Sequence, residues 1–129
     1  MPKKKIKLLI VDDEKDICEF VKRLFKKKGF LVYGALSGKQ AVKITQKVKP
    51  DIALLDIYLR KGIDGLTALK EIRKIAPLCQ CVMVTWDKTE AKVKEAKAIG
   101  AVSYLTKPLT IDQLLRVVSR VAKNIRKRG

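Results

Sequence analysis

Five short runs of apolar and β-branched residues alternate along this chain with five stretches of helical periodicity, and this alternation constrains the fold most. Two of the runs, LLIV at 8–11 and IALL at 52–55, are continuously apolar. Strands of that kind are typical of a parallel sheet that helices cover on both faces. The sequence therefore predicts a doubly wound α/β protein of (βα)5 type. We expect the strands at residues 6–11, 30–34, 52–55, 81–85 and 102–105.

Between the strands, apolar residues recur at helical spacing, and recognisable boundary residues mark the ends of each stretch. Gly29 ends the first helix, Ser37 is a suitable N-cap for the second, and Thr110 is a suitable N-cap for the fifth. The third helix is expected over about residues 65–75 and the fourth over about residues 89–99. The apolar face of the first helix is expected to consist of Ile17, Phe20, Val21, Leu24 and Phe25.

The length of 129 residues suits one domain with its own core, and we expect a single domain over residues 1–129. The basic tail from about residue 123 is a candidate linker stub. No apolar run reaches membrane-spanning length, and the basic N-terminus leads into an apolar stretch of only about six residues. We therefore expect a cytoplasmic protein that does not enter membranes.

The absence of histidine excludes several kinds of chemistry. No histidine of this chain can act as a base, a metal ligand or a phosphoryl carrier. The three cysteines, Cys18, Cys79 and Cys81, form no CxxC pair, so a tetrahedral zinc site would lack ligands. We expect three reduced thiols that are largely buried.

Polar residues follow four of the expected strands. Asp12 and Asp13 come after the first, Asp56 after the third, Thr85 ends the fourth, and Lys107 follows the fifth. Ligands of open parallel sheets bind beyond the carboxyl ends of the strands, so these side chains are expected to meet. Clustered carboxylates need a cation, and an oxygen-only ligand set suits Mg²⁺. A carboxylate beside Mg²⁺ and a lysine is suited to accept a phosphoryl group.

Five segments in order carry a family resemblance over nearly the whole chain. They are LLIVDDE at 8–14, PDIALLDI at 50–57, DGL at 64–66, VMVT at 82–85 and GAVSYLTKPL at 100–109. With them the chain resembles the receiver domain of two-component response regulators, of the chemotaxis-regulator type. The resemblance implies a flavodoxin-like five-stranded sheet with strand order 2-1-3-4-5.

The same resemblance implies roles at the acceptor site. Asp56 would be the phosphorylated residue, and Asp13 and Asp56 would ligate Mg²⁺ directly. Asp12 would act mostly through water, and the backbone carbonyl of Tyr58 would be a further ligand. Lys107 would pair with Asp56 or with the phosphoryl group. The implied enzymatic activity is confined to the protein's own phosphorylation and dephosphorylation.

A switch is implied as well. Thr85 would bond a phosphoryl oxygen and move on activation, and Tyr104 would turn its ring inward. The peptide bond between Lys107 and Pro108 is expected to be cis. Phosphorylation would then bias a surface made of the fourth helix, the fifth strand and the fifth helix. The donor would be a histidine kinase or phosphotransfer protein, and the output a downstream protein or a further domain.

Several residues depart from the family pattern. Trp86 stands after Thr85, where a small residue is usual; we expect it to slow phosphoryl entry or water attack, unless its ring packs away from the site. Arg60 stands where proline is frequent, and we expect Arg60 and Lys61 to lie near the anionic site. Val102 and Ser103 stand where acidic residues are common, so the dimer of one large subfamily is not expected here.

The chain carries 30 Lys and Arg against 13 Asp and Glu, a net charge of +17. The densest basic segments are residues 3–7, 22–28 and 123–128. A solvated lysine-rich surface and a surface that contacts nucleic acid or acidic protein both fit this excess. An alternative function is therefore a degenerate receiver that binds protein or nucleic acid without phosphorylation. A nucleotide-binding enzyme is set aside because GxGxxG and GxxxxGK[ST] are absent.

Overall fold

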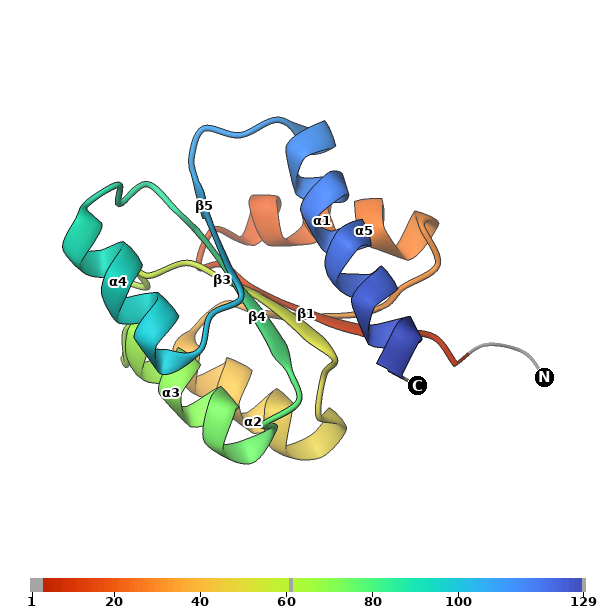
Figure 1. The fold of residues 1–129 in the computed structure, drawn as a ribbon, viewed down its shortest axis with the longest axis horizontal. Coiled ribbons are helices and arrows are strands. Elements are labelled where there is room, and N and C mark those ends of the chain that lie inside the picture. The colour runs from red at the N-terminus through yellow and green to blue at the C-terminus, as the bar shows by residue number, and fades with distance from the viewer. Residues whose placement is uncertain (1–3, 61, 129) are drawn as a thin grey trace.

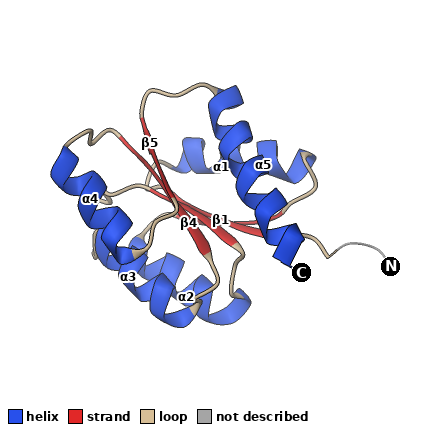
Figure 2. Cartoon of the chain, in the orientation of Figure 1, coloured by secondary structure: helices blue, strands red, loops and turns tan. Residues whose placement is uncertain are grey.

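The computed structural model describes residues 4–60 and 62–128, and within them strands and helices alternate strictly. All strand pairings are parallel, in the order β2-β1-β3-β4-β5 (Figures 1 and 2). The strands are β1 (Lys7–Val11), β2 (Leu31–Ala35), β3 (Ile52–Leu55), β4 (Gln80–Thr85) and β5 (Ser103–Thr106). The helices are α1 (Lys15–Lys27), α2 (Gly38–Val48), α3 (Gly65–Ile75), α4 (Glu90–Ile99) and α5 (Ile111–Arg128).

The predicted fold is confirmed: a five-stranded parallel sheet in the order 2-1-3-4-5 with helices on both faces. Helices α1 and α5 cover one face, and α2, α3 and α4 cover the other (Figure 1). Successive strand residues point to opposite faces, so Leu8 and Ile10 join the core beneath α1 and α5. Leu9 and Val11 join the core on the other side. This double burial explains why the β1 and β3 runs are continuously apolar.

The expected apolar face of α1 is partly wrong. Cys18 and Phe25 are buried, whereas Ile17 and Phe20 are 38% and 46% exposed. A helix turns by about 100° per residue, so Phe20 lies about 140° from Phe25 around the axis. The buried stripe is centred on Cys18 and Phe25, and Ile17 and Phe20 lie outside it. Their apolar surface therefore remains in contact with solvent.

Other expectations can be compared directly with the structure. The three cysteines are buried and unpaired, as predicted. Residues 123–128, the candidate linker stub, continue helix α5. Lys3, which belongs to the first basic segment, and Lys61, which is expected near the anionic site, lie outside the described residues. No helix in the described ranges is long and apolar enough to cross a membrane.

A close backbone approach places the segment after β3 against the start of α3. Asp64 is the N-cap of α3, and its side chain accepts a hydrogen bond from the Thr67 N–H at 2.8 Å. The Gly65 N–H donates to the Ile57 carbonyl at 2.7 Å. A Cβ atom at Gly65 would lie 1.8 Å from the carbonyl oxygen of Asp56. Only glycine permits this contact, which fixes the backbone that carries Asp56.

We predict that Gly65→Ala lowers the free energy of unfolding by roughly 3 kcal/mol or more, because the methyl group overlaps backbone atoms. Urea denaturation followed by circular dichroism measures this change. Gly29→Ala is the comparison, since Gly29 has a positive φ of 94° but open space around its Cβ position. That variant should lose only about 1–2 kcal/mol. Equal losses would show that the contact at Gly65 is not tight.

Candidate functional site

The carboxyl ends of four strands bring the predicted site residues to one edge of the sheet. Asp12 and Asp13 follow β1, Asp56 follows β3, Thr85 ends β4, and Lys107 follows β5. The chain passes from β1 outward to β2 and returns to β3 on the other side of β1. Asp12 and Asp56 therefore flank the point where the strand order reverses, which is where open parallel sheets bind ligands.

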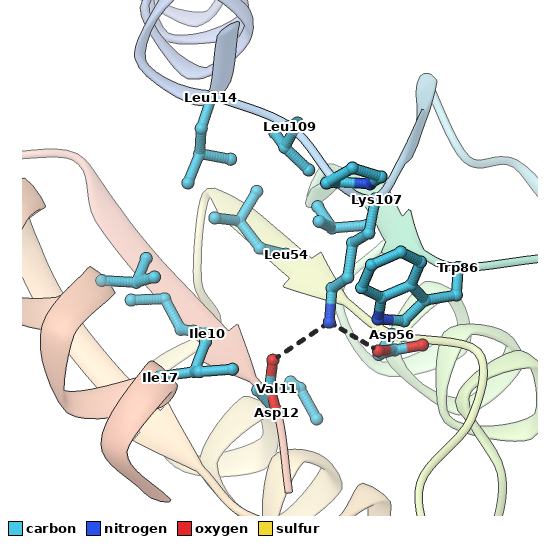
Figure 3. A pocket seen from close by; sticks show the side chains of 13 residues that line it. Ile10, Val11, Asp12, Ile17, Leu54, Asp56, Trp86, Lys107, Leu109 and Leu114 are labelled. Carbon is cyan, nitrogen blue, oxygen red and sulfur yellow. Dashed lines mark hydrogen bonds and ion pairs between the residues drawn. The ribbon is translucent and has the colours of Figure 1, made fainter. Parts of the chain in front are cut away.

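Lys107 joins the two buried carboxylates. Its Nζ lies 3.0 Å from Asp56 Oδ2 and 3.6 Å from Asp12 Oδ2 (Figure 3). Burial raises the pKa of the Asp12 carboxyl, although the Glu14 backbone N–H and the Lys107 charge oppose this shift. Burial alone would lower the pKa of Lys107, but the hydrogen bond and charge of Asp56, with Asp12, raise it overall. The ammonium group is thus held charged between two carboxylates.

The backbone around Lys107 explains how the side chain reaches across the sheet. The peptide bond between Lys107 and Pro108 is cis. The Lys107 N–H donates to the Thr85 carbonyl at 2.8 Å, which ties the end of β5 to the end of β4. The side chain then extends past β4 toward Asp56 and Asp12 (Figure 3).

Asp13 lies at the same edge but is paired differently. Asp13 Oδ2 accepts hydrogen bonds from the Arg60 backbone N–H at 2.9 Å and from Arg60 Nε at 3.1 Å. Sequence reasoning placed Arg60 near the anionic site and missed this pairing. The two residues are 47 positions apart, in the loops after β1 and β3. Arg60 thereby connects those two loops.

Asp87, which sequence reasoning missed, accepts hydrogen bonds from three residues. Its Oδ1 accepts from the Thr89 N–H at 2.9 Å and the Thr89 hydroxyl at 2.6 Å, and Oδ2 accepts from the Tyr58 hydroxyl. The hydrogen bonds from Thr89, and then that from Tyr58, lower the pKa of Asp87. The Tyr104 hydroxyl donates to the Asp87 backbone carbonyl at 2.6 Å. The only sequence signal was an aspartate two residues before a threonine, a common turn pattern.

Asp87 also connects the expected switch residues to Asp56. Its backbone N–H lies 3.4 Å from the Thr85 hydroxyl oxygen, which is fully buried. On the other side, the Tyr58 backbone N–H donates to Asp56 Oδ1 at 3.0 Å. Burial, followed by the charge of Asp87, raises the pKa of Tyr104 to about 12, so its hydroxyl remains a donor. Thr85, Tyr104 and Asp56 therefore share one hydrogen-bonded loop region.

Trp86 covers one side of a hollow beside the site. The hollow has a volume of about 250 Å³, and its wall includes Asp56 and Lys107 (Figure 3). Most of the remaining wall is apolar and comes from β1, α1 and the start of α5, for example Ile17 and Leu114. The Trp86 side chain is 62% exposed, so it borders the hollow without closing it.

The donor atoms fit a hard cation that keeps part of its water. Among the residues that the structure describes, no three Asp, Glu or Cys side chains are grouped so that they could hold a metal ion by themselves. Mg²⁺ in proteins takes one or two carboxylates and retains several waters, so it needs no such group. Asp12, Asp13 and Asp56 offer only oxygen atoms, and Lys107 and Arg60 now balance their charge. The role of the Tyr58 carbonyl as a further ligand stays a prediction.

Comparisons with known proteins give one consistent result. The family described as "Response regulator receiver domain" matches residues 8–119. Sporulation initiation phosphotransferase F of Bacillus subtilis is 32% identical over 114 residues, which cover 88% of this chain and 91% of that protein. A CheY-like receiver domain protein from Methanospirillum hungatei has 25% identity and a TM-score of 0.92, covering 98% of this chain and 100% of that one. A two-component response regulator from Clostridium difficile has 30% identity and a TM-score of 0.87, covering 94% and 98%.

We predict that Arg60→Gln strengthens Mg²⁺ binding, because Arg60 and a metal ion compete for the same Asp13 oxygen. The expected decrease in Kd is about three- to tenfold, or roughly 0.7–1.4 kcal/mol. Isothermal titration calorimetry on protein first treated with a chelator measures the change. Lys88→Gln is the matched control, since Lys88 is an exposed cation in the loop after β4 with no ion pair among the described residues. An equal change in both variants would attribute the effect to net charge.

Proposed function

This chain belongs to the response regulator receiver domain family, and from that premise we propose that it is a signalling switch phosphorylated on Asp56. The observation that carries the proposal is the 3.0 Å contact between Lys107 Nζ and Asp56 Oδ2. Asp12 shares the same ammonium group, and Asp13 lies at the same edge of the sheet. Of the acidic residues at this edge, Asp56 is the one that both Lys107 and the Tyr58 N–H hold by hydrogen bonds.

These contacts suit phosphoryl transfer. The Asp56 carboxylate would attack the phosphorus atom of the donor, forming an O–P bond as the donor's P–N or P–O bond breaks. Lys107 would offset the charge on the transferred oxygens, and the buried Thr85 hydroxyl would donate a hydrogen bond to one of them. A bound Mg²⁺, held by Asp12, Asp13, Asp56 and the Tyr58 carbonyl, would supply further charge neutralisation.

The hydrogen bonds of Asp87 support a conformational response. If Thr85 moves toward a phosphoryl group, the contact between its hydroxyl and the Asp87 N–H changes. The Asp87 carbonyl holds Tyr104 on β5, and the Asp87 side chain is bonded to Thr89 at the start of α4. The switch surface we propose is thus made of α4, β5 and α5, with two arrangements that phosphorylation biases.

A phosphohistidine donor must lie outside these 129 residues, because they contain no histidine. We infer a histidine kinase or phosphotransfer protein as the physiological donor. Exposed Ile17 and Trp86 line the apolar hollow beside Asp56 and offer such a protein an apolar contact surface. We infer one receiver domain over residues 1–129, whose output is a downstream protein or a further domain.

A degenerate receiver that binds partners without phosphorylation is the second candidate function. Two observations favour it. The Trp86 side chain lines the hollow that contains Asp56, and Arg60 donates a hydrogen bond to Asp13 Oδ2. Both features can reduce access of a donor or a metal ion. Measuring whether Asp56 becomes phosphorylated separates this candidate from the first.

Intact-mass measurement after incubation with acetyl phosphate tests the proposed function. We predict a gain of about 80 Da, one phosphoryl group, that requires Mg²⁺ and is absent in Asp56→Asn. Asp112→Asn, which removes an exposed carboxylate from the first turn of α5, should gain the same mass as wild type. If folded wild-type protein and Trp86→Ala both gain no mass, or if Asp56→Asn gains as much as wild type, the proposal is wrong.

Trp86 should control the rate of phosphoryl entry. We predict that Trp86→Ala accelerates phosphorylation by acetyl phosphate about three- to tenfold, equivalent to roughly 0.7–1.4 kcal/mol of barrier. Trp86→Phe keeps an aromatic ring in place and should change the rate less. A time course of the mass gain measures both variants. Unchanged rates in Trp86→Ala would mean that the indole packs away from the path of the donor.

A further inference from the structure

Four basic side chains form a stripe along the outer face of α5. Arg116, Arg120, Lys123 and Lys127 are spaced by four, three and four residues, and all four are exposed. At about 100° per residue they fall within an arc of about 60°, and they extend over about 16 Å of helix. The opposite face of α5 is apolar and buried against the sheet. We call these four residues the α5 stripe.

The α5 stripe has no acidic partner within the described residues. Helices α3 and α4 pair their lysines with glutamates, as in the contacts Lys74–Glu71 and Lys94–Glu90. Residues 113–128 contain no acidic residue, and no ion pair is formed there. Like charges at i,i+4 spacing destabilise a helix, and basic residues stabilise only its last turn. Lys127 lies in that last turn, but Arg116, Arg120 and Lys123 lie before it, so the helix dipole does not account for these three residues.

Further basic residues extend this surface beyond α5. Lys28, at the end of α1, lines a hollow together with Arg126 of α5. Lys4 and Lys5 line a second hollow that also includes Arg126. Helices α1 and α5 lie on the same side of the sheet, and the described N-terminal residues lie near the end of α5 (Figure 1). We refer to the stripe together with Lys4, Lys5, Lys28 and Arg126 as the basic face.

The basic face lies away from the acidic site. Asp12, Asp13 and Asp56 stand at the carboxyl edge of the sheet, whereas helix C-termini and strand N-termini lie at the opposite edge. Lys28, Arg126 and Lys127 are at that opposite edge. Asp51 is at that edge too and lines the hollow of Lys4, Lys5 and Arg126. A polyanion bound there would meet this carboxylate but not Asp12, Asp13 or Asp56.

The kinds of side chain on the basic face indicate which class of anionic partner it can bind. Of the large apolar side chains that are exposed in the described residues, the only one on α5 is Ile111, at its start. A membrane-surface helix needs an exposed apolar face beside its basic residues, and protein interfaces depend on apolar or aromatic anchors. Proteins that bind single-stranded nucleic acid stack its unpaired bases on aromatic rings, and α5 contains no aromatic residue. A phosphate backbone needs only charge and donors, which arginine and lysine supply.

We propose that the basic face binds the phosphate backbone of double-stranded nucleic acid without reading its sequence. This interaction is independent of Asp56 and goes beyond the proposed switch. Fluorescence anisotropy with a labelled DNA duplex of about 20 base pairs, measured between about 50 and 300 mM salt, gives the affinity and its salt dependence. Four or more phosphate contacts predict a slope of log K against log salt of about −4 or steeper.

The decisive variant removes the stripe and keeps the fold. Replacing Arg116, Arg120, Lys123 and Lys127 together by glutamine should flatten the slope by about three to four, which weakens binding at least tenfold at about 100 mM salt. All four side chains are exposed, so the buried face of α5 is unchanged. The variant should still gain one phosphoryl group, which separates this proposal from the proposed function.

A charge-matched control tests the location. Lys39, Lys43 and Lys47 on α2 and Lys70 on α3 are exposed and lie on the other side of the sheet (Figure 1). Their joint replacement by glutamine removes the same charge and should leave DNA binding nearly unchanged. Equal losses in the two variants, or no binding at about 100 mM salt, would overturn the proposal. So would tighter binding to polyglutamate or to phosphatidylserine vesicles than to the duplex.

Discussion

The contact of Lys107 with Asp56 and Asp12 is the interaction on which the site depends. A parallel sheet with β1 beside β3 brings two carboxylates to one partly buried edge, where isolated negative charges are unfavourable. The ammonium group at 3.0 and 3.6 Å offsets that charge. The hydrogen bond from the Lys107 N–H to Thr85 holds the same residue against β4. One side chain and its backbone thus connect β1, β3, β4 and β5.

Two cations of the chain occupy positions where a metal ion and a phosphoryl group would act. Lys107 donates to the Asp56 carboxylate, and Arg60 donates to that of Asp13. A metal ion or phosphoryl group that binds at this edge must therefore replace Lys107 or Arg60 as the partner of a carboxylate oxygen. Asp87 connects such an exchange to the surface, because it is bonded to Tyr58 beside the acceptor and to Tyr104 on β5. The contacts that would couple the site to the surface are hydrogen bonds between the loops after β3 and β4 and strand β5.

The sequence predicted the features that follow from local periodicity. The expected bounds of each strand agree with the observed bounds to within one residue, because burial on both faces produces continuous apolar runs. The pairing of Arg60 with Asp13 and that of Tyr58 with Asp87 were missed, since they join residues 47 and 29 positions apart in loops without periodicity. The exposure of Phe20 was missed because an apolar residue near the edge of a helix stripe can be buried or exposed, depending on what packs beside it. The resemblance identified which strand-end residues to examine, and the loop contacts required the structure.

The central claim is that the folded sheet edge by itself forms a Mg²⁺ site around Asp56. Trp86, the single tryptophan, lines the hollow that contains Asp56, so its fluorescence reports events there. We would titrate chelator-treated protein with Mg²⁺ and compare NaCl at equal ionic strength. The account predicts a saturable fluorescence change in wild type that is lost in Asp13→Asn and absent with NaCl. No saturable change in wild type, or an undiminished one in Asp13→Asn, would contradict it.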